Sequence, residues 1–209
     1  MPDGVPVLYR DDALVVVDKP AGLLAVPGRG EQAQDCVASR VQAMFADALV
    51  VHRLDQATSG LMLLARGGAA QRALSRAFAE RRIAKRYTAV VGGLIDGDEG
   101  CIDLPLCSDW PNRPRQQVDA VHGKPSQTRW RVLSRDACAQ TTRVELEPLS
   151  GRSHQLRVHL QALGHPIVGD ALYAPASLAA PRLLLHACAL TLAHPHDGRA
   201  LNFASATPF

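Results

Sequence analysis

Residues 52–61 carry the side chains with the clearest chemical potential, in the order His-Arg-Leu-Asp-Gln-Ala-Thr-Ser-Gly-Leu. One carboxylate, Asp55, lies between a guanidinium, Arg53, and a Thr-Ser-Gly turn, and an apolar run follows at once. An acid held at the end of a strand can act on a reacting atom as a nucleophile or a general base. It can equally cap its own turn by accepting the amide hydrogens of Thr58 or Ser59. The motif alone leaves both interpretations open.

Two further side chains could complete a site around Asp55. Tyr87 lies in Ala-Lys-Arg-Tyr-Thr-Ala, and Arg157 lies in Gly-Arg-Ser-His-Gln-Leu-Arg-Val-His. Burial pushes a carboxyl group toward its neutral form, and a neighbouring arginine counters this because a guanidinium keeps its charge. We therefore expect Asp55 beside Arg157 to be a permanently ionised nucleophile or base. Taken singly, Tyr87 can be an ordinary sheet tyrosine and Arg157 a surface arginine of a helix.

The basic residues of the chain are unevenly placed, although the net charge is only +3. Residues 66–86 hold seven basic residues against one acid, and residues 110–135 hold six against one. Such patches attract phosphate even on a nearly neutral molecule, or they are simply solvated surface. Aromatic residues make up only 4% of the chain, which argues against a sheet that reads RNA by base stacking.

Several functional classes are disfavoured by what the sequence lacks. Five cysteines are an odd number and form no Cys-x-x-Cys, so neither a disulfide framework nor a zinc site is expected. His154 and His159 are five residues apart and share a helix face poorly, so we expect no metal. We expect no cofactor, and no membrane partner because no apolar run is long enough to span one. With no signal-peptide pattern, the chain is expected to be cytoplasmic.

The hydrophobic pattern predicts short strands interrupted by a few helices, over one domain that spans residues 1–209. Strands are expected at residues 5–9, 13–18, 50–54, 61–65, 86–91, 102–106, 127–133, 141–149, 183–186, 189–192 and 201–204. Helices are expected from the N-cap Asp35 to about residue 46, over 67–82, and from the N-cap Ser153 with Leu156, Leu160 and Leu163 inward and Gly164 as its stop. The fold class is therefore α+β: a mixed, mostly antiparallel sheet flanked by helices. We expect an active-site cleft across that sheet.

Six blocks, in order along nearly the whole chain, resemble the RluA family of pseudouridine synthases. Their residues are 18–22 (Asp-Lys-Pro-Ala-Gly), 52–60, 85–89 (Lys-Arg-Tyr-Thr-Ala), 151–159, 164–170 (Gly-His-Pro-Ile-Val-Gly-Asp) and 182–187. Asp18 and Ser153 depart mildly from the family's usual Asn and Thr. Residues 26–29 and 109–114 resemble the family's short members, which act on both large-subunit rRNA and tRNA. As in those members, no N-terminal S4-type module is expected.

The resemblance implies isomerisation of uridine to pseudouridine within RNA, without a cofactor or metal. Asp55 would be the essential group, either adding covalently or acting as a base at the sugar toward a glycal-type intermediate. Tyr87 would stack on the base and help remove the C5 proton. Arg157 would hold Asp55 charged and aimed.

The resemblance also implies that the target base is flipped out of its helix. Arg53 would fill the vacated space, unless it forms a structural salt bridge. Leu184, with its neighbours at 183 and 185, would wall the uracil pocket, unless these leucines are core. Four arginines would grip phosphates of rRNA or tRNA, with the protein as a monomer: Arg72, Arg76, Arg113 and Arg115.

Two other classes compete with this interpretation. A non-catalytic RNA-binding protein explains the basic patches but leaves an arginine-paired carboxylate without a purpose. A retaining glycosidase needs two carboxylates roughly 5 Å apart, and no second acid lies in the blocks. A hydrolase built from Ser59, His154 and Asp55 would lack a Gly-x-Ser-x-Gly elbow. The same isomerisation on a different RNA also remains open.

Overall fold

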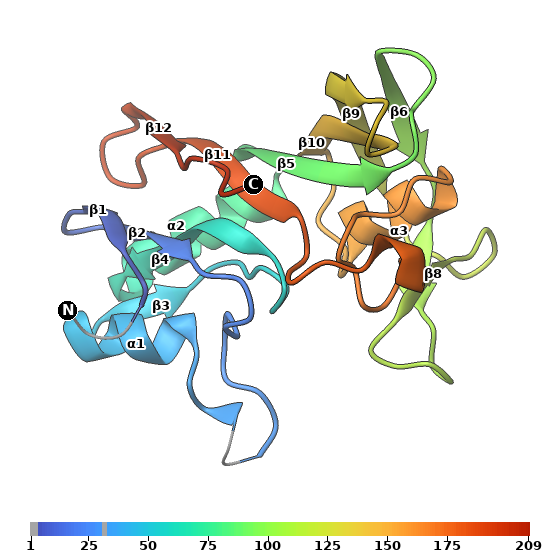
Figure 1. Cartoon of the computed structure of the whole chain (residues 1–209). Coiled ribbons are helices and arrows are strands. Elements are labelled where there is room, and N and C mark those ends of the chain that lie inside the picture. The colour runs from blue at the N-terminus through green and yellow to red at the C-terminus, as the bar shows by residue number, and fades with distance from the viewer. Residues whose placement is uncertain (1–3, 31–32) are drawn as a thin grey trace. The chain divides into compact units, whose positions relative to one another are not determined.

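The computed structural model describes residues 4–30 and 33–209, and the chain forms two compact units (Figure 1). The first unit comprises Met1–Lys85 and Ala187–Pro208, and the second comprises Arg86–His186 with Phe209. The chain passes from one unit to the other within two strands, β5 (Ala84–Gly92) and β11 (Leu185–Ala193).

The first unit contains a sheet in the order β1-β2-β4-β11, with β12 paired to β11 and β3 paired to β4. Its other strands are β1 (Val7–Arg10), β2 (Leu14–Lys19), β3 (Ala48–Val50), β4 (Ser59–Arg66) and β12 (Ala200–Ala204). Both faces of β4 are covered, since every residue from Ser59 to Ala65 is buried. This is why the sequence there reads as a continuous apolar run rather than an alternating one.

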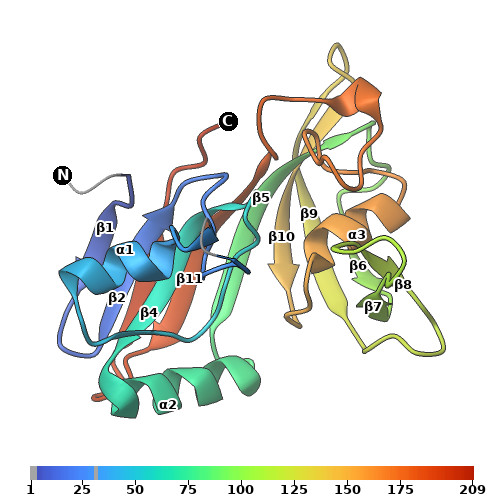
Figure 2. The same cartoon turned by 90° about the horizontal axis from the view of Figure 1, so that it is seen from below.

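Two helices cover this sheet, α1 (Val37–Met44) and α2 (Gly67–Ala79) (Figure 2). Helix α2 follows β4 directly and buries Ala70, Leu74 and Ala77, which recur at helical spacing, in the core that also holds Leu61 and Leu63. The loop that precedes β4 joins β3 to β4, two strands that pair in this sheet.

The second unit contains a sheet in the order β5-β10-β9-β6, whose pairs are antiparallel. Its strands are β6 (Glu99–Asp103), β9 (Gln127–Asp136) and β10 (Thr141–Pro148), together with β5. A separate hairpin joins β7 (Leu106–Ser108) to β8 (Gln116–Val118). The helix α3 (Gln155–Ala162) contacts β8 and β10, and a short 3-10 helix, η2 (Ala176–Leu178), follows.

The fold class predicted from the sequence is confirmed: the protein is α+β, with a mostly antiparallel sheet flanked by helices. The predicted cleft across the sheet, and the single domain over residues 1–209, stay predictions. The helices expected at 67–82 and after residue 153, and most strands, are found within a few residues of their predicted limits.

Both predicted N-caps are wrong. Helix α1 is capped by Cys36, whose thiol accepts the Ser39 amide, while Asp35 forms an ion pair with Arg40 at 2.6 Å. Helix α3 starts after His154, which has a left-handed backbone (φ 53°) and no side-chain cap. Leu163 was also expected inward, but it is 39% exposed because the helix has already ended. Gly164 stops the helix as predicted, with φ 89°.

Three strand predictions also need correction. The strand expected at 50–54 stops at Val50, because the chain then leaves the sheet for the loop that carries Asp55. The strand expected at 102–106 is split between β6 and β7. The two strands expected at 183–186 and 189–192 form one strand, β11.

Candidate active site

Asp55 lies half-buried in the loop between β3 and β4. The loop closes a turn in which the Thr58 amide donates to the backbone carbonyl of Asp55 at 3.1 Å. Gln56 pairs with Gly22 in both directions: its carbonyl accepts the Gly22 amide at 2.9 Å, and its side-chain amide donates to the Gly22 carbonyl at 3.0 Å. The sequence blocks at 18–22 and 52–60 are thus hydrogen-bonded to each other.

A buried lysine fastens the far side of this loop. Lys19 is fully buried, and its ammonium donates to the backbone carbonyls of Pro20 (2.9 Å), Gln56 (2.9 Å) and Thr58 (2.7 Å). Burying an ammonium is costly unless its hydrogens are bonded, so the loop carbonyls make the burial of Lys19 possible. The ammonium in turn holds these carbonyls, and with them the loop backbone, in place. Lys19 was not among the predicted site residues, although it lies inside a block that resembles the family.

The loop ends at Gly60, where only glycine fits. Its φ is 109°, in the left-handed region, and a Cβ there would lie 2.3 Å from the carbonyl oxygen of Ala187. This close approach sets the direction in which the chain leaves the loop and joins β4.

His52 anchors the start of the loop. Its Nε2 accepts the Leu63 amide hydrogen at 2.9 Å, and its ring stacks on Phe78 with centroids 4.5 Å apart. Burial, with a smaller contribution from the charge of Lys85, lowers the pKa of His52 to about 3. The imidazole is therefore neutral near pH 7, and its accepting nitrogen is used by the sheet. His52 holds the loop rather than carrying a proton.

Arg157 is 5% exposed on α3, so the interpretation of it as a surface arginine is wrong. Its Nε and Nη2 donate to the two carboxylate oxygens of Asp170, both at 2.7 Å, and Asp170 is 2% exposed. This bidentate fork uses two of the five N–H donors of the guanidinium and fixes its plane. Asp170 was not anticipated, although it closes a block that resembles the family. The pairing expected between Arg157 and Asp55 stays a prediction.

Tyr87 and Leu184 both lie in the second unit. Tyr87 is half-buried in β5, opposite Leu146 of β10. Leu184 bonds through its backbone to Val90 (3.1 Å) and Val168 (2.9 Å), and its side chain is partly exposed. Its neighbours Leu183 and Leu185 are buried to 3% exposure. The core interpretation therefore applies to these neighbours, and Leu184 alone of the three offers surface to a ligand.

Four of the five arginines predicted to contact RNA are exposed, and the fifth, Arg115, is half-buried. Arg72 and Arg76 are exposed on α2, one turn apart, and Arg53 is exposed without an ion pair among the described residues of its unit. In the β7–β8 hairpin loop, the Arg113 guanidinium lies 3.0 Å from the ring centre of Trp110, which is 68% exposed. A cation stacked on an exposed indole suits contact with phosphate and base together.

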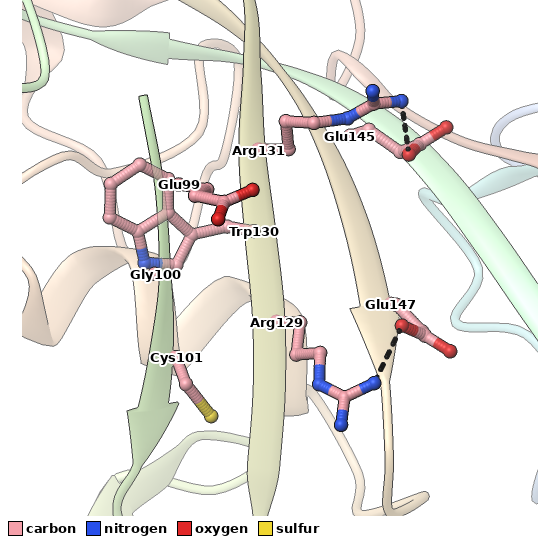
Figure 3. A pocket seen from close by; sticks show the side chains of 8 residues that line it. All are labelled: Glu99, Gly100, Cys101, Arg129, Trp130, Arg131, Glu145 and Glu147. Atoms are coloured by element: carbon pink, nitrogen blue, oxygen red, sulfur yellow. Dashed lines mark hydrogen bonds and ion pairs between the residues drawn. The ribbon is translucent and has the colours of Figure 1, made fainter. Parts of the chain in front are cut away.

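A shallow pocket on β6, β9 and β10 contains none of these residues (Figure 3). It is lined by cross-strand ion pairs, Arg131 with Glu145 at 2.9 Å and Arg129 with Glu147 at 3.5 Å. Both of its arginines are already paired, and the remaining charged residue of the lining is the acid Glu99, so we interpret the pocket as a solvated sheet face rather than a site for phosphate. Across the described parts of the chain, no helix is long and apolar enough to cross a membrane. No cluster of His, Cys, Asp and Glu suited to a metal was found in residues 4–30 and 33–209.

Comparison with known proteins gives consistent matches. Residues 13–162 match a family model described as RNA pseudouridylate synthase. The chain is 52% identical over 205 residues to an Escherichia coli O6:H1 protein named "Dual-specificity RNA pseudouridine synthase RluA", covering 97% of this chain and 93% of that protein. A Yersinia pestis protein of the same name is 51% identical, with 97% and 99% covered. The solved structure "Human RNA Pseudouridylate Synthase Domain Containing 1" is similar over 100% of this chain and 86% of its own, with TM-score 0.82 and 30% identity.

Proposed function

The chain belongs to the RNA pseudouridylate synthase family, and from that premise we propose that it converts specific uridines of 23S rRNA and of the tRNA anticodon stem-loop to pseudouridine. The enzyme class, a pseudouridine synthase and thus an isomerase, follows from the family and from relatives about half identical over nearly their whole length. The pair of RNA substrates rests on the words "dual-specificity" in the names of those relatives and on the resemblance to short family members.

The reaction breaks the bond between ribose C1′ and uracil N1 and forms a bond from C1′ to C5. N1 gains a proton and C5 loses one, so the atoms balance without a co-reactant. Asp55 is the group that starts this exchange, by adding to the nucleoside or by removing a sugar proton toward a glycal intermediate. A nucleophile or base must hold its geometry to be effective. The anchors from Lys19, His52 and Gly60 supply that rigidity.

Arg157 and Tyr87 act with Asp55 in this proposal. Arg157 keeps the carboxylate ionised and aimed, since a guanidinium does not lose its charge. Tyr87 stacks on the flipped uracil and assists loss of the C5 proton. The burial of Arg157 and its fork to Asp170 support an oriented guanidinium rather than a mobile one.

The remaining residues receive the RNA. Arg53 fills the space left by the flipped base, and Leu184 borders the uracil. Phosphates are held by Arg72 and Arg76 on α2 and by Arg113 and Arg115 in the β7–β8 loop. The protein works as a monomer in the cytoplasm, where its RNA substrates are made and folded.

The observation that carries the proposal is the position of Asp55, a half-buried carboxylate in a loop whose backbone is fixed by a fully buried ammonium. The test uses purified full chain with two transcripts carrying tritium at C5 of uridine: a 23S rRNA stem-loop and a tRNA anticodon arm. The proposal expects tritium release to water from both, at one uridine each. Release from neither transcript, with both still bound, would instead favour a non-catalytic RNA-binding protein. Release from a different RNA alone would contradict the substrate assignment and retain the chemistry.

A further inference from the structure

The turn that follows Asp170 ends at a tyrosine with an unusual set of partners. Asp170 accepts the amide hydrogens of Leu172 (3.0 Å) and Tyr173 (3.2 Å) on the same oxygen that receives Arg157 Nη2. The turn and the guanidinium therefore share one carboxylate. Any displacement of residues 170–173 moves the fork that sets the plane of Arg157.

Tyr173 contacts the guanidinium directly through its ring. The side chain is 5% exposed, and the Arg157 guanidinium carbon lies 5.0 Å from its ring centre. On the same ring, the guanidinium carbon of Arg115 lies 5.4 Å from the centre. Tyr173 is thus the aromatic surface shared by the buried arginine of α3 and an arginine of the β7–β8 loop.

The hydroxyl of Tyr173 fastens that loop to the start of α3. It accepts the Gln116 amide hydrogen at 2.7 Å, at the first residue of β8, and it lies 2.7 Å from Nδ1 of His154. The loop itself is ordered by internal bonds: the Asp109 amide donates to Arg115 at 3.0 Å, and the Asn112 side chain donates to the Asp109 carboxylate. Because these bonds hold the loop together, its position depends on the residues that join it to the rest of the unit, and Tyr173 bonds to one of them, Gln116.

We propose that Tyr173 is a positioning residue that joins the β7–β8 loop, Asp109–Arg115, to the guanidinium of Arg157. Its hydroxyl sets the base of the loop, and its ring and turn set Arg157. The inference rests on the proposed function, because Arg157 must serve the isomerisation for its placement to matter. Tyr173 acts on the rate of the chemical step rather than on the affinity for RNA, because its hydroxyl also holds the start of α3, the helix that carries Arg157. The bonds within the loop keep the loop arginines ordered when that hydroxyl is lost.

The test is Tyr173→Phe in the full chain, because this change keeps the ring and removes only the hydroxyl. Tyr9→Phe is the matched control: it removes a hydroxyl bonded to Asp11 and Arg199, away from the site residues of the first unit. Single-turnover tritium release at saturating RNA gives the rate constant, and filter binding gives Kd. We expect the rate constant of Tyr173→Phe to fall by about tenfold or more, as small misplacements of catalytic groups do. Kd should stay within about twofold and Tyr9→Phe should match wild type in both.

The outcomes separate the two proposals. A wild-type enzyme without tritium release would defeat the proposed function and this inference with it. An active wild type with an equally fast Tyr173→Phe, or with Kd weakened as much as the rate, would defeat only the inference. Hydrogen exchange of the Gln116 amide, measured on the same samples, should be faster in Tyr173→Phe. If Tyr173→Phe melts below the assay temperature, His154→Asn replaces it, because asparagine tolerates the left-handed backbone at this position. This variant must likewise lower the rate constant and leave Kd unchanged.

Discussion

The ammonium of Lys19 donates to the backbone carbonyl of Thr58 at 2.7 Å, across 39 residues of sequence. Thr58 is also the residue whose amide closes the turn begun by Asp55. A single fully buried cation therefore fixes the backbone on which the proposed catalytic carboxylate stands. The relationship explains why two separate sequence blocks are needed for one loop.

Replacing this cation tests the anchor. Lys19→Met keeps the length and burial of the side chain but removes the ammonium from three carbonyls, of which that of Gln56 still accepts the Gly22 amide. We expect the free energy of unfolding to fall by about 1–3 kcal/mol, because lost bonds to a charged donor outweigh the relief of burying it. The rate at saturating RNA should fall about a hundredfold, since the carboxylate loses its fixed position. Urea denaturation and single-turnover tritium release measure the two effects.

Lys124→Met is the matched control for this change, because Lys124 is exposed and bonds through its backbone only. It should leave both the unfolding free energy and the single-turnover rate unchanged. A fully active Lys19→Met would show that the loop does not depend on the ammonium.

His52 makes the stability of the protein depend on pH in a defined window. The pKa of His52 is about 3 in the folded chain, below the ordinary value of 6.5. Between these two pH values the unfolded chain binds a proton at His52 and the folded chain does not. Its contribution to stability is complete above pH 6.5 and is lost as the pH falls below that value. The slope approaches ~1.4 kcal/mol per pH unit for one proton.

His52→Gln should reduce this slope between pH 7 and pH 5, since a side-chain amide oxygen can accept the Leu63 amide hydrogen without titrating. The slope that remains would come from other groups such as His159, whose pKa is also lowered by burial. Burial raises the pKa of Asp11, but hydrogen bonds from Tyr9 and from two backbone amides outweigh this effect and lower the pKa to about 2. Protonation of Asp11 therefore changes the stability of the protein only below about pH 4. Urea denaturation at each pH gives the slope. The exposed His122 serves as control through His122→Gln. Equal slopes in wild type and His52→Gln would refute the role given to His52.

The loop that carries Asp55 could be predicted as a turn before a buried strand, because its residue types and the apolar run that follows lie close together in the sequence. The catalytic role of Asp55 stays a prediction. Lys19 and Asp170 were missed for a physical reason: each acts through a partner far along the chain, Thr58 in one case and Arg157 in the other. A lysine next to a proline and an aspartate after a glycine carry no local signal of burial. Only the three-dimensional contacts reveal that both are nearly inaccessible.

The helix starts show the same limit on a smaller scale. Asp35 and Ser153 are favoured N-cap residues, yet the N-caps lie one residue later, at Cys36 and His154. Asp35 is drawn into an ion pair with Arg40 instead. Local preference was overridden by contacts that only the folded chain provides, as happens often at helix ends.

Arg76 on α2 tests the predicted phosphate contacts. Arg76→Ala should weaken binding of rRNA and tRNA fragments about equally and reduce the slope of log K against log salt by roughly one unit. Arg131→Ala is the control, because Arg131 is an exposed arginine already paired with Glu145. Filter binding from low to high salt measures both variants. An unchanged slope for Arg76→Ala would remove α2 from the RNA-binding surface.

In the proposed reaction, Asp55 performs the chemistry while other residues hold the RNA. Asp55→Asn keeps the size of the side chain and removes its charge, so it should bind the tRNA anticodon arm with a Kd within about threefold of wild type and release no tritium. The direct measurement is single-turnover release from C5-tritiated RNA at saturating Asp55→Asn, with Kd determined on the same preparation. Tight binding without release is the predicted result. Release by this variant within about tenfold of the wild-type rate would show that Asp55 is not the catalytic group.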